Sequence, residues 1–140
     1  MYVKDYHSMS SEVLRKVEQS VLERLHKVVG AAGVVTDEAD KSPYLKDERG
    51  YFTGTTPMVL RPASTEEVAK LVRICNETHT PIVPQGGNTG LCGGATPYEH
   101  GGEVLLSLTR MNNVRALDPL NYTITVEAGV ILSDVQAAAD

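Results

Sequence analysis

Apolar residues between Val13 and Val29 recur at spacings of three and four residues and predict a long amphipathic helix. We expect this helix to begin at Ser10 or Ser11, to end at Gly30 and to pack on the flank of a domain. A role in binding a partner helix is the alternative. The nine residues before the helix show no periodicity, so the pattern places no element there.

The next two segments change the pattern from helical to extended and then to polar. Residues 33–36 predict a short strand or an extended linker. Residues 37–55 are charged and rich in turn-forming residues, which predicts a solvated surface loop. Such a loop can reach over a neighbouring site.

A strand, a helix and a second strand follow within about thirty residues. Residues 57–61 and 81–84 predict the strands, and the helix between them begins at a capping box formed by Ser64 and Glu67. It extends to about Thr78 and should bury one apolar face, made of Val68, Leu71, Val72 and Cys75. This βαβ unit predicts two parallel strands with a right-handed crossover.

The second half of the chain predicts an additional sheet. Residues 103–107 predict a strand, and its continuous apolar centre, residues 104–106, is typical of a strand buried on both faces. Residues 114–117 and 122–126 alternate and flank the turn sequence 118–121, so they predict an antiparallel hairpin, and a helix begins at about Leu132. We therefore expect an α+β fold: a small parallel βαβ sheet flanked by helices, then the start of an antiparallel sheet. Because this hairpin and helix cannot bury their faces alone, we expect the chain to be part of a longer protein.

A glycine-rich loop directly follows the strand 81–84. It contains five glycines within residues 86–94, and glycine loses more backbone freedom on folding than any other residue. Such a loop is typical of a backbone that approaches a ligand closely and binds an anion through its N–H groups. No Lys or Arg occurs from Pro81 to Gly102, so peptide groups and hydroxyls would hold the anion. A flexible surface loop is the alternative.

Composition excludes several classes of protein. The net charge is −5, with no basic stripe, which argues against a nucleic-acid partner. No apolar stretch is long enough for a membrane span, and the N-terminus lacks the apolar region of a signal peptide. Cys75 and Cys92 lie far apart in different predicted elements, so we expect no disulfide and an intracellular location, cytoplasmic or, in a eukaryote, the mitochondrial matrix.

Familiar chemical motifs are missing from the sequence. It contains neither the Gly-x-Gly-x-x-Gly fingerprint nor a P-loop, and the histidines and cysteines have no metal-ligand spacing, so we expect no metal. No nucleophile, base and acid can be grouped into a catalytic triad. The remaining combination, a parallel sheet and a lysine-free glycine loop at the carboxyl end of a strand, fits a diphosphate-bearing cofactor.

Four motifs, in order, resemble one known family. They are residues 61–68, the loop 84–94, residues 107–112 and residues 126–129. Together they resemble the FAD-binding domain of the vanillyl-alcohol oxidase and p-cresol methylhydroxylase (PCMH) type. Within it they are most similar to the FAD-linked 2-hydroxy acid dehydrogenases, such as D-lactate dehydrogenase, the flavoprotein component of glycolate oxidase and D-2-hydroxyglutarate dehydrogenase. The resemblance begins at about Tyr44, which divides the chain into an N-terminal helix and linker (1–43) and the first part of the FAD domain (44–140).

The resemblance implies a set of cofactor-binding residues. The pyrophosphate of FAD would lie against the loop, the flavin would lie nearer the end of the loop, and the segment 128–129 would line the cofactor cleft. The implied residues are Pro84, Gly86, Gly87, Asn88, Thr89, Gly90, Leu91, Gly94, Ala95, Ala128 and Gly129. Many relatives attach FAD covalently through a histidine at the position of Asn88. Asparagine cannot form that bond, so we expect non-covalent FAD, although Cys92 is a second residue where attachment could occur.

The resemblance also implies an activity. The expected reaction is oxidation of a D-2-hydroxy acid by hydride transfer from its α-carbon to the flavin, with the substrate site and the catalytic residues beyond Asp140. Two alternatives remain open: another oxidase of the PCMH family, acting on a sugar or an alcohol, and a truncated nucleotide-binding module without activity of its own. The electron acceptor is not indicated, and a homo-oligomer is left open.

Overall fold

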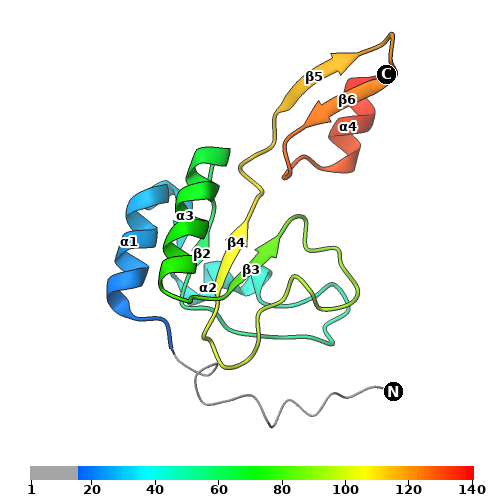
Figure 1. The fold of residues 1–140 in the computed structure, drawn as a ribbon. Coiled ribbons are helices and arrows are strands. Elements are labelled where there is room, and N and C mark those ends of the chain that lie inside the picture. Colours follow the sequence, from blue (N-terminus) through cyan, green and yellow to red (C-terminus); the bar gives the residue numbers. More distant parts are fainter. Residues whose placement is uncertain (1–15) are drawn as a thin grey trace.

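The computed structural model describes residues 16–140 (Figure 1). Helix α1 spans Gln19–Val29 and ends as predicted at Gly30, whose φ of 66° favours glycine. The predicted start at Ser10 or Ser11 lies outside the described residues. Within them the prediction is wrong for Val17, because residues 16–18 are not helical. Val17 nevertheless packs against the core, so an apolar position outside the helix extended the pattern.

One four-stranded sheet contains the parallel unit. Its strands are β1 (Val34–Val35), β2 (Val59–Leu60), β3 (Ile82–Gln85) and β4 (Val104–Ser107), in the order β1-β2-β4-β3. Strand β4 pairs in parallel with both β2 and β3, which makes the two strands of the predicted βαβ unit parallel to each other although they are not neighbours. Strand β1 pairs antiparallel with β2, so the first of the two interpretations of residues 33–36 is confirmed.

Helix α3, Thr65–Glu77, connects β2 to β3 and begins close to its predicted position. The Ser64 hydroxyl accepts a hydrogen bond from the backbone N–H of Glu67 at 3.2 Å, as the capping box requires. The Glu67 carboxylate accepts from the N–H of Ala63 at 2.7 Å, one residue earlier than the predicted partner. Both hydrogen bonds of a capping box are therefore present, but the Glu67 carboxylate bonds the N–H of Ala63 in place of that of Ser64.

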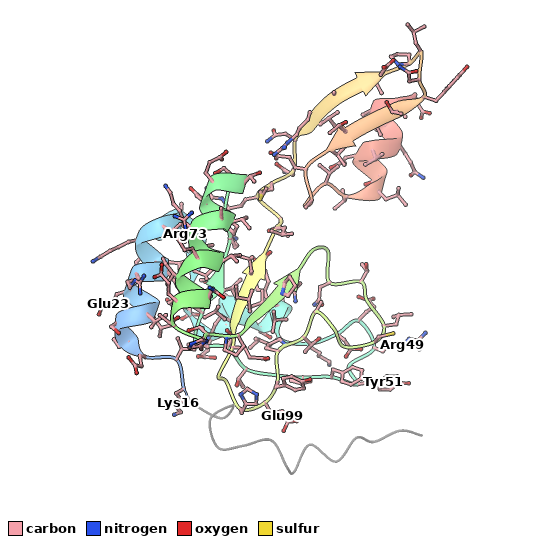
Figure 2. The ribbon with its side chains drawn as sticks, in the orientation of Figure 1. Lys16, Glu23, Arg49, Tyr51, Arg73 and Glu99 are labelled. Atoms are coloured by element: carbon pink, nitrogen blue, oxygen red, sulfur yellow. The ribbon has the colours of Figure 1, made fainter. Side chains whose placement is uncertain are left out.

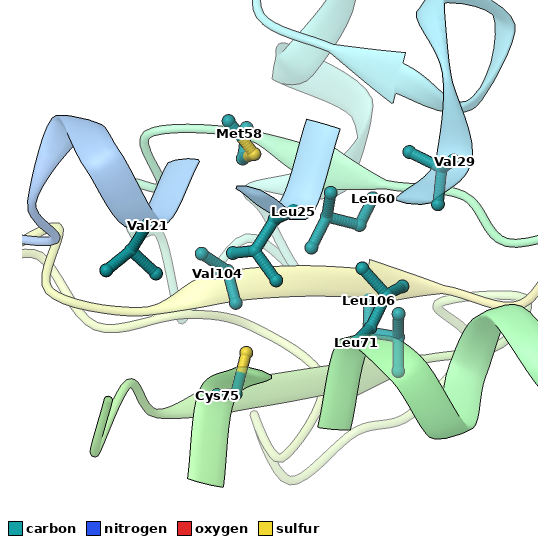
Figure 3. Close-up of a cluster of buried hydrophobic side chains, with 9 residues drawn as sticks. All are labelled: Val21, Leu25, Val29, Met58, Leu60, Leu71, Cys75, Val104 and Leu106. Atoms are coloured by element: carbon teal, nitrogen blue, oxygen red, sulfur yellow. The ribbon is translucent and has the colours of Figure 1, made fainter. Parts of the chain in front are cut away.

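The hydrophobic core lies between one face of this sheet and the helices α1 and α3 (Figure 3). The sheet and both helices contribute residues to it. The buried side chains are Val21, Leu25, Val29, Met58, Leu60, Leu71, Cys75, Val104 and Leu106. Burial of Val72 was predicted and is wrong, because this residue is 45% exposed and lines a surface groove with Pro81 and Ile82. The face of α3 that meets the sheet and α1 is narrow, and Val72 lies beside it.

The second unit consists of a hairpin and a helix, as predicted. Strands β5 (Val114–Asp118) and β6 (Thr123–Val126) pair antiparallel, and α4 spans Leu132–Ala139. Figure 1 shows this unit projecting from the end of β4, away from α1. Its apolar side chains include Leu120, 91% exposed, and Leu132, 70% exposed. The α+β fold is confirmed, with a parallel sheet followed by an antiparallel one.

The charged segment 37–55 is mostly exposed, as predicted, but it is not a loop throughout. It contains helix α2 (Glu38–Lys41) and the 3-10 turn η3 (Ser42–Tyr44), and it buries two charged residues. The Lys41 ammonium donates to the Glu38 carboxylate at 2.7 Å and to the Thr56 carbonyl at 2.8 Å. Asp47 accepts from the backbone N–H of Phe52 through Oδ1 at 2.8 Å, while its Oδ2 is buried without a partner among the described residues. These hydrogen bonds offset part of the cost of burying the two charges, a compensation that composition cannot reveal.

Candidate cofactor-binding site

The glycine loop leaves β3 at Gln85 and carries no regular secondary structure through residue 94. At Gly86, Gly87, Gly90 and Gly94 an added Cβ would meet no atom of the chain within 4 Å, and none of these residues has a positive φ. Neither packing nor backbone strain within the described chain therefore requires glycine at these four positions. A ligand lying against the backbone would require it, because a side chain would fill the space that such a ligand needs.

A second segment packs along this loop. We call residues 42–54 the strap; it crosses beside the glycine loop in the lower part of Figure 1. The side-chain amide of Asn88, a residue with φ 55°, donates to Pro43 O at 3.3 Å and to Lys46 O at 2.8 Å. The ring of Phe52 lies against Gly93, where a Cβ would come within 2.8 Å of it. The charged segment thus reaches the neighbouring site, as the sequence suggested.

The segment Ala128-Gly129 is joined to the end of β3 by a chain of backbone hydrogen bonds. Leu108 N donates to Gln85 O at 2.9 Å, Met111 N donates to Leu108 O at 2.9 Å, and Gly129 N donates to Met111 O at 2.8 Å. The two predicted parts of the site are therefore linked at the carboxyl edge of the parallel strands. In such sheets, ligands bind at this edge.

The remaining predicted site residues occupy different positions around the loop. Pro84 is exposed within β3, Thr89 is exposed, and Leu91 is 48% exposed. Ala95 is partly buried, and its carbonyl accepts a hydrogen bond from Gln85. The exposed residues leave their surfaces available to a ligand, whereas Ala95 fixes the end of the loop.

Sequence reasoning missed Gln85. This residue is only 2% exposed, and its side-chain Nε2 donates to Tyr44 O and to Ala95 O, each at 2.9 Å. The signal was present in the strand pattern, because the period of two places Gln85 on the same face as the buried Val83. A polar side chain at a buried strand position needs partners, and these partners belong to the two segments that border the site.

The polar groups of the loop are its peptide groups, the Asn88 amide, the Thr89 hydroxyl and the Cys92 thiol. Residues 86–95 contain no acidic side chain and no Lys, Arg or His. The basic residues of the strap are Lys46 and Arg49; Figure 2 shows Arg49 and Tyr51 at the edge of the molecule away from α1 and α3. Within residues 16–140 no cluster of His, Cys, Asp or Glu is arranged to hold a metal ion. The loop therefore offers N–H groups to an anion, and Cys92 is its only side chain of a type that commonly transfers protons.

The two cysteines are not bonded to each other. Cys75 is buried in the core and Cys92 is exposed in the glycine loop. Burial raises the pKa of the Cys75 thiol to about 11. Among the helices in the described part of the chain, none has both the length and the apolar character needed to cross a membrane.

An α+β fold in which an open glycine cradle follows a parallel strand defines a protein that binds a diphosphate cofactor. Solved structures share this fold. 4-Ethylphenol oxidase from Gulosibacter chungangensis matches with a TM-score of 0.71 and 29% identity, over 94% of this chain and 25% of that one. p-Cresol methylhydroxylase matches with a TM-score of 0.72 and 24% identity, over 94% of this chain and 25% of that one. The PCMH-type fold is confirmed.

The FAD binding domain family matches residues 56–140, more than half of the chain, and the chain belongs to this family. D-lactate dehydrogenase of Anaerostipes hadrus is 36% identical over 133 residues, which are 94% of this chain and 27% of that protein. Glycolate oxidase subunit GlcD of Bacillus subtilis (strain 168) is 36% identical over 124 residues, 89% of this chain and 26% of that protein. The chain thus spans about a quarter of the length of these relatives. The prediction of FAD as the cofactor is confirmed.

Proposed function

We propose that this chain is the FAD-holding part of an oxidoreductase that oxidises a D-2-hydroxy acid. The observation that carries the proposal is the open cradle, where four glycines border space that no atom of the chain occupies. In it the backbone N–H groups of residues 86–90 bind the diphosphate, while Gly94 and Ala95 lie nearer the flavin. Ala128 and Gly129 line the cleft from the second unit.

The attachment of FAD in this proposal is non-covalent. Asn88 has no nucleophilic atom that could bond to the flavin, and both protons of its amide are already donated to the strap. The side-chain oxygen and the backbone N–H of Asn88 remain for contact with the cofactor. Bound FAD supplies the two-electron acceptor, and this chain binds it and orients its ring.

The proposed substrate class rests on the relatives and not on the geometry of this chain. The similar proteins are named D-lactate dehydrogenase, glycolate oxidase subunit GlcD and probable D-2-hydroxyglutarate dehydrogenase. We further propose an intracellular location, supported by two cysteines that form no disulfide, and a start of the cofactor-binding segment near residue 44, after the N-terminal helix and linker. Helix α1 nevertheless shares its core with α3, so residues before that point belong to the same folded unit.

The cradle is tested by blocking it. Gly87→Val in the intact protein should abolish FAD binding, because the branched side chain fills the space beside the backbone; visible absorption during FAD titration measures this. Ala69→Val, the corresponding change on the exposed side of α3, should bind FAD as the unchanged protein does. Full occupancy in Gly87→Val would contradict the assignment of this loop.

Two further measurements separate the parts of the proposal. Acid precipitation of the holoprotein should release the flavin into the supernatant, whereas flavin that stays with the protein would contradict non-covalent binding. A panel of D- and L-2-hydroxy acids with a dye acceptor should show turnover of D-acids. Turnover of sugars or alcohols alone would assign the protein to another branch of the family.

A further inference from the structure

The side chain of Gln85 connects the two ends of the glycine loop and the strap. Gln85 is the last residue of β3, directly before Gly86, and its side chain donates a hydrogen bond to the carbonyl of Ala95 at the far end of the loop. Its second bond goes to the carbonyl of Tyr44 in the strap. Because both partners are carbonyl oxygens, only the amide nitrogen can satisfy them, and both of its protons are used.

Asn88 repeats this arrangement three residues further along. Its amide nitrogen also bonds two strap carbonyls, those of Pro43 and Lys46, while its backbone adopts a left-handed conformation. That conformation is uncommon for a residue other than glycine, and asparagine tolerates it better than most residues. Two side-chain amides therefore join the strap to the loop within the short segment 43–46.

We propose that Gln85 is a positioning residue for FAD, which fixes the spacing of the glycine loop and the strap so that residues 86–90 present their N–H groups in one geometry. This inference rests on the proposed binding of the FAD diphosphate to that loop. Glycines at residues 86, 87 and 90 do not restrict the backbone themselves, since they have open space around them. The shape of the loop must therefore come from its attachments, and Gln85, which directly precedes the loop, supplies one to its far end and one to the strap.

The variant Gln85→Glu tests this inference, because it should change FAD affinity in a pH-dependent way that a purely structural role does not predict. An ionised carboxylate can only accept hydrogen bonds, so it would face two carbonyl oxygens in a buried position and repel both. Burial and the missing donors raise the pKa of this new carboxyl group. Once protonated, it regains an O–H that donates to one of the two carbonyls. The defect should therefore be reversed by acid.

The experiment measures the dissociation constant of FAD by flavin fluorescence in the intact protein, at about pH 8 and at about pH 5.5. Relative to the unchanged protein, Gln85→Glu should bind FAD at least about tenfold more weakly at the higher pH and within about threefold at the lower pH. Gln85→Met, which has similar length and no donor, should bind more weakly at both values without recovery. Gln136→Glu, the same change at an exposed position of α4, should bind normally at both.

Thermal melting of each apoprotein shows whether the variant folds. A folded Gln85→Glu protein with unchanged affinity at the higher pH would overturn the inference. If Gln85→Glu does not fold there, Gln85→Met decides. A lower melting temperature with unchanged FAD affinity would make Gln85 a structural residue and overturn the inference as well. Full FAD binding by Gly87→Val would instead overturn the proposed cradle, so the two failures are distinguishable.

Discussion

Gly129 lies so close to the backbone of Leu108 that a Cβ on Gly129 would collide with the Leu108 carbonyl oxygen. The same glycine donates its N–H to the carbonyl of Met111 at 2.8 Å. These two contacts hold the start of the second unit against the segment that leaves β4. Gly129 is therefore required by packing within the chain, whereas Gly90 in the cradle is not.

Gly129→Ala should lower the free energy of unfolding by about 1–3 kcal/mol, because the added methyl group must displace backbone atoms. Urea denaturation monitored by circular dichroism measures this. Gly90→Ala is the matched change: it should leave the free energy of unfolding within about 1 kcal/mol of the unchanged value, yet weaken FAD binding. Equal stability of the two variants would contradict the contact at Leu108.

Ser64→Ala should destabilise the protein by about 1 kcal/mol, since it removes the acceptor for the N–H of Glu67 at the start of α3. The same denaturation experiment measures the loss. Ser20→Ala, at an exposed position in the first turn of α1, should change stability by less than about 0.5 kcal/mol. If both variants lost the same amount, the cap would have no special role.

Stability should decline in alkaline solution because of Cys75. Burial raises its pKa from the ordinary 9.0 to about 11, so the unfolded chain loses this proton before the folded one. The stabilising contribution is complete below pH 9 and is lost as the pH rises through about 11. Comparison with Cys75→Ala across this range measures it, and that variant should lose less stability between the two values. Parallel curves would contradict the prediction.

Glu127 should titrate below the ordinary value of 4.5. The backbone N–H of Asn113 lowers its pKa most, followed by the Asn113 side chain, and Arg115 adds to the effect. Because the folded pKa is lowered, this stabilisation is present above the unfolded pKa and is lost as the pH falls through the folded one. Carboxyl carbon NMR during an acid titration gives the midpoint. Arg115→Met should raise it only partly, since the Asn113 bonds remain, and a complete return to 4.5 would contradict this order of causes.

The local elements followed from the sequence where one short segment contains the whole signal. The cap at Ser64, the end of α1 at Gly30 and the fully buried β4 each depend on neighbours in sequence, and the structure has them as predicted. The glycine loop was recognisable for the same reason. The glycines that cause its cost in backbone entropy are visible in the sequence itself.

Several failures depend on contacts between segments that are distant in sequence. Lys41 resembled a solvated residue, but its ammonium bonds the carbonyl of Thr56, fifteen positions away, and no local pattern indicates that burial. The sequence predicted Val72 to be a core residue, but the packing of α1 against α3 covers a different face of α3 and leaves Val72 exposed. The role of the strap at Asn88 likewise joins residues more than forty positions apart.

The order of strands in the first sheet has a consequence for how the chain folds. Strand β4 lies between β2 and β3 but follows both in the sequence, and β3 pairs with β4 alone. Strand β3 therefore has no ladder partner until the chain has passed through the glycine loop and returned. Closing a loop of that length lowers the chain entropy before any strand hydrogen bond can offset the loss, and this slows folding. We therefore expect closure of the glycine loop to contribute to the folding barrier, so that substitutions in the loop should change the refolding rate even where they leave equilibrium stability unchanged.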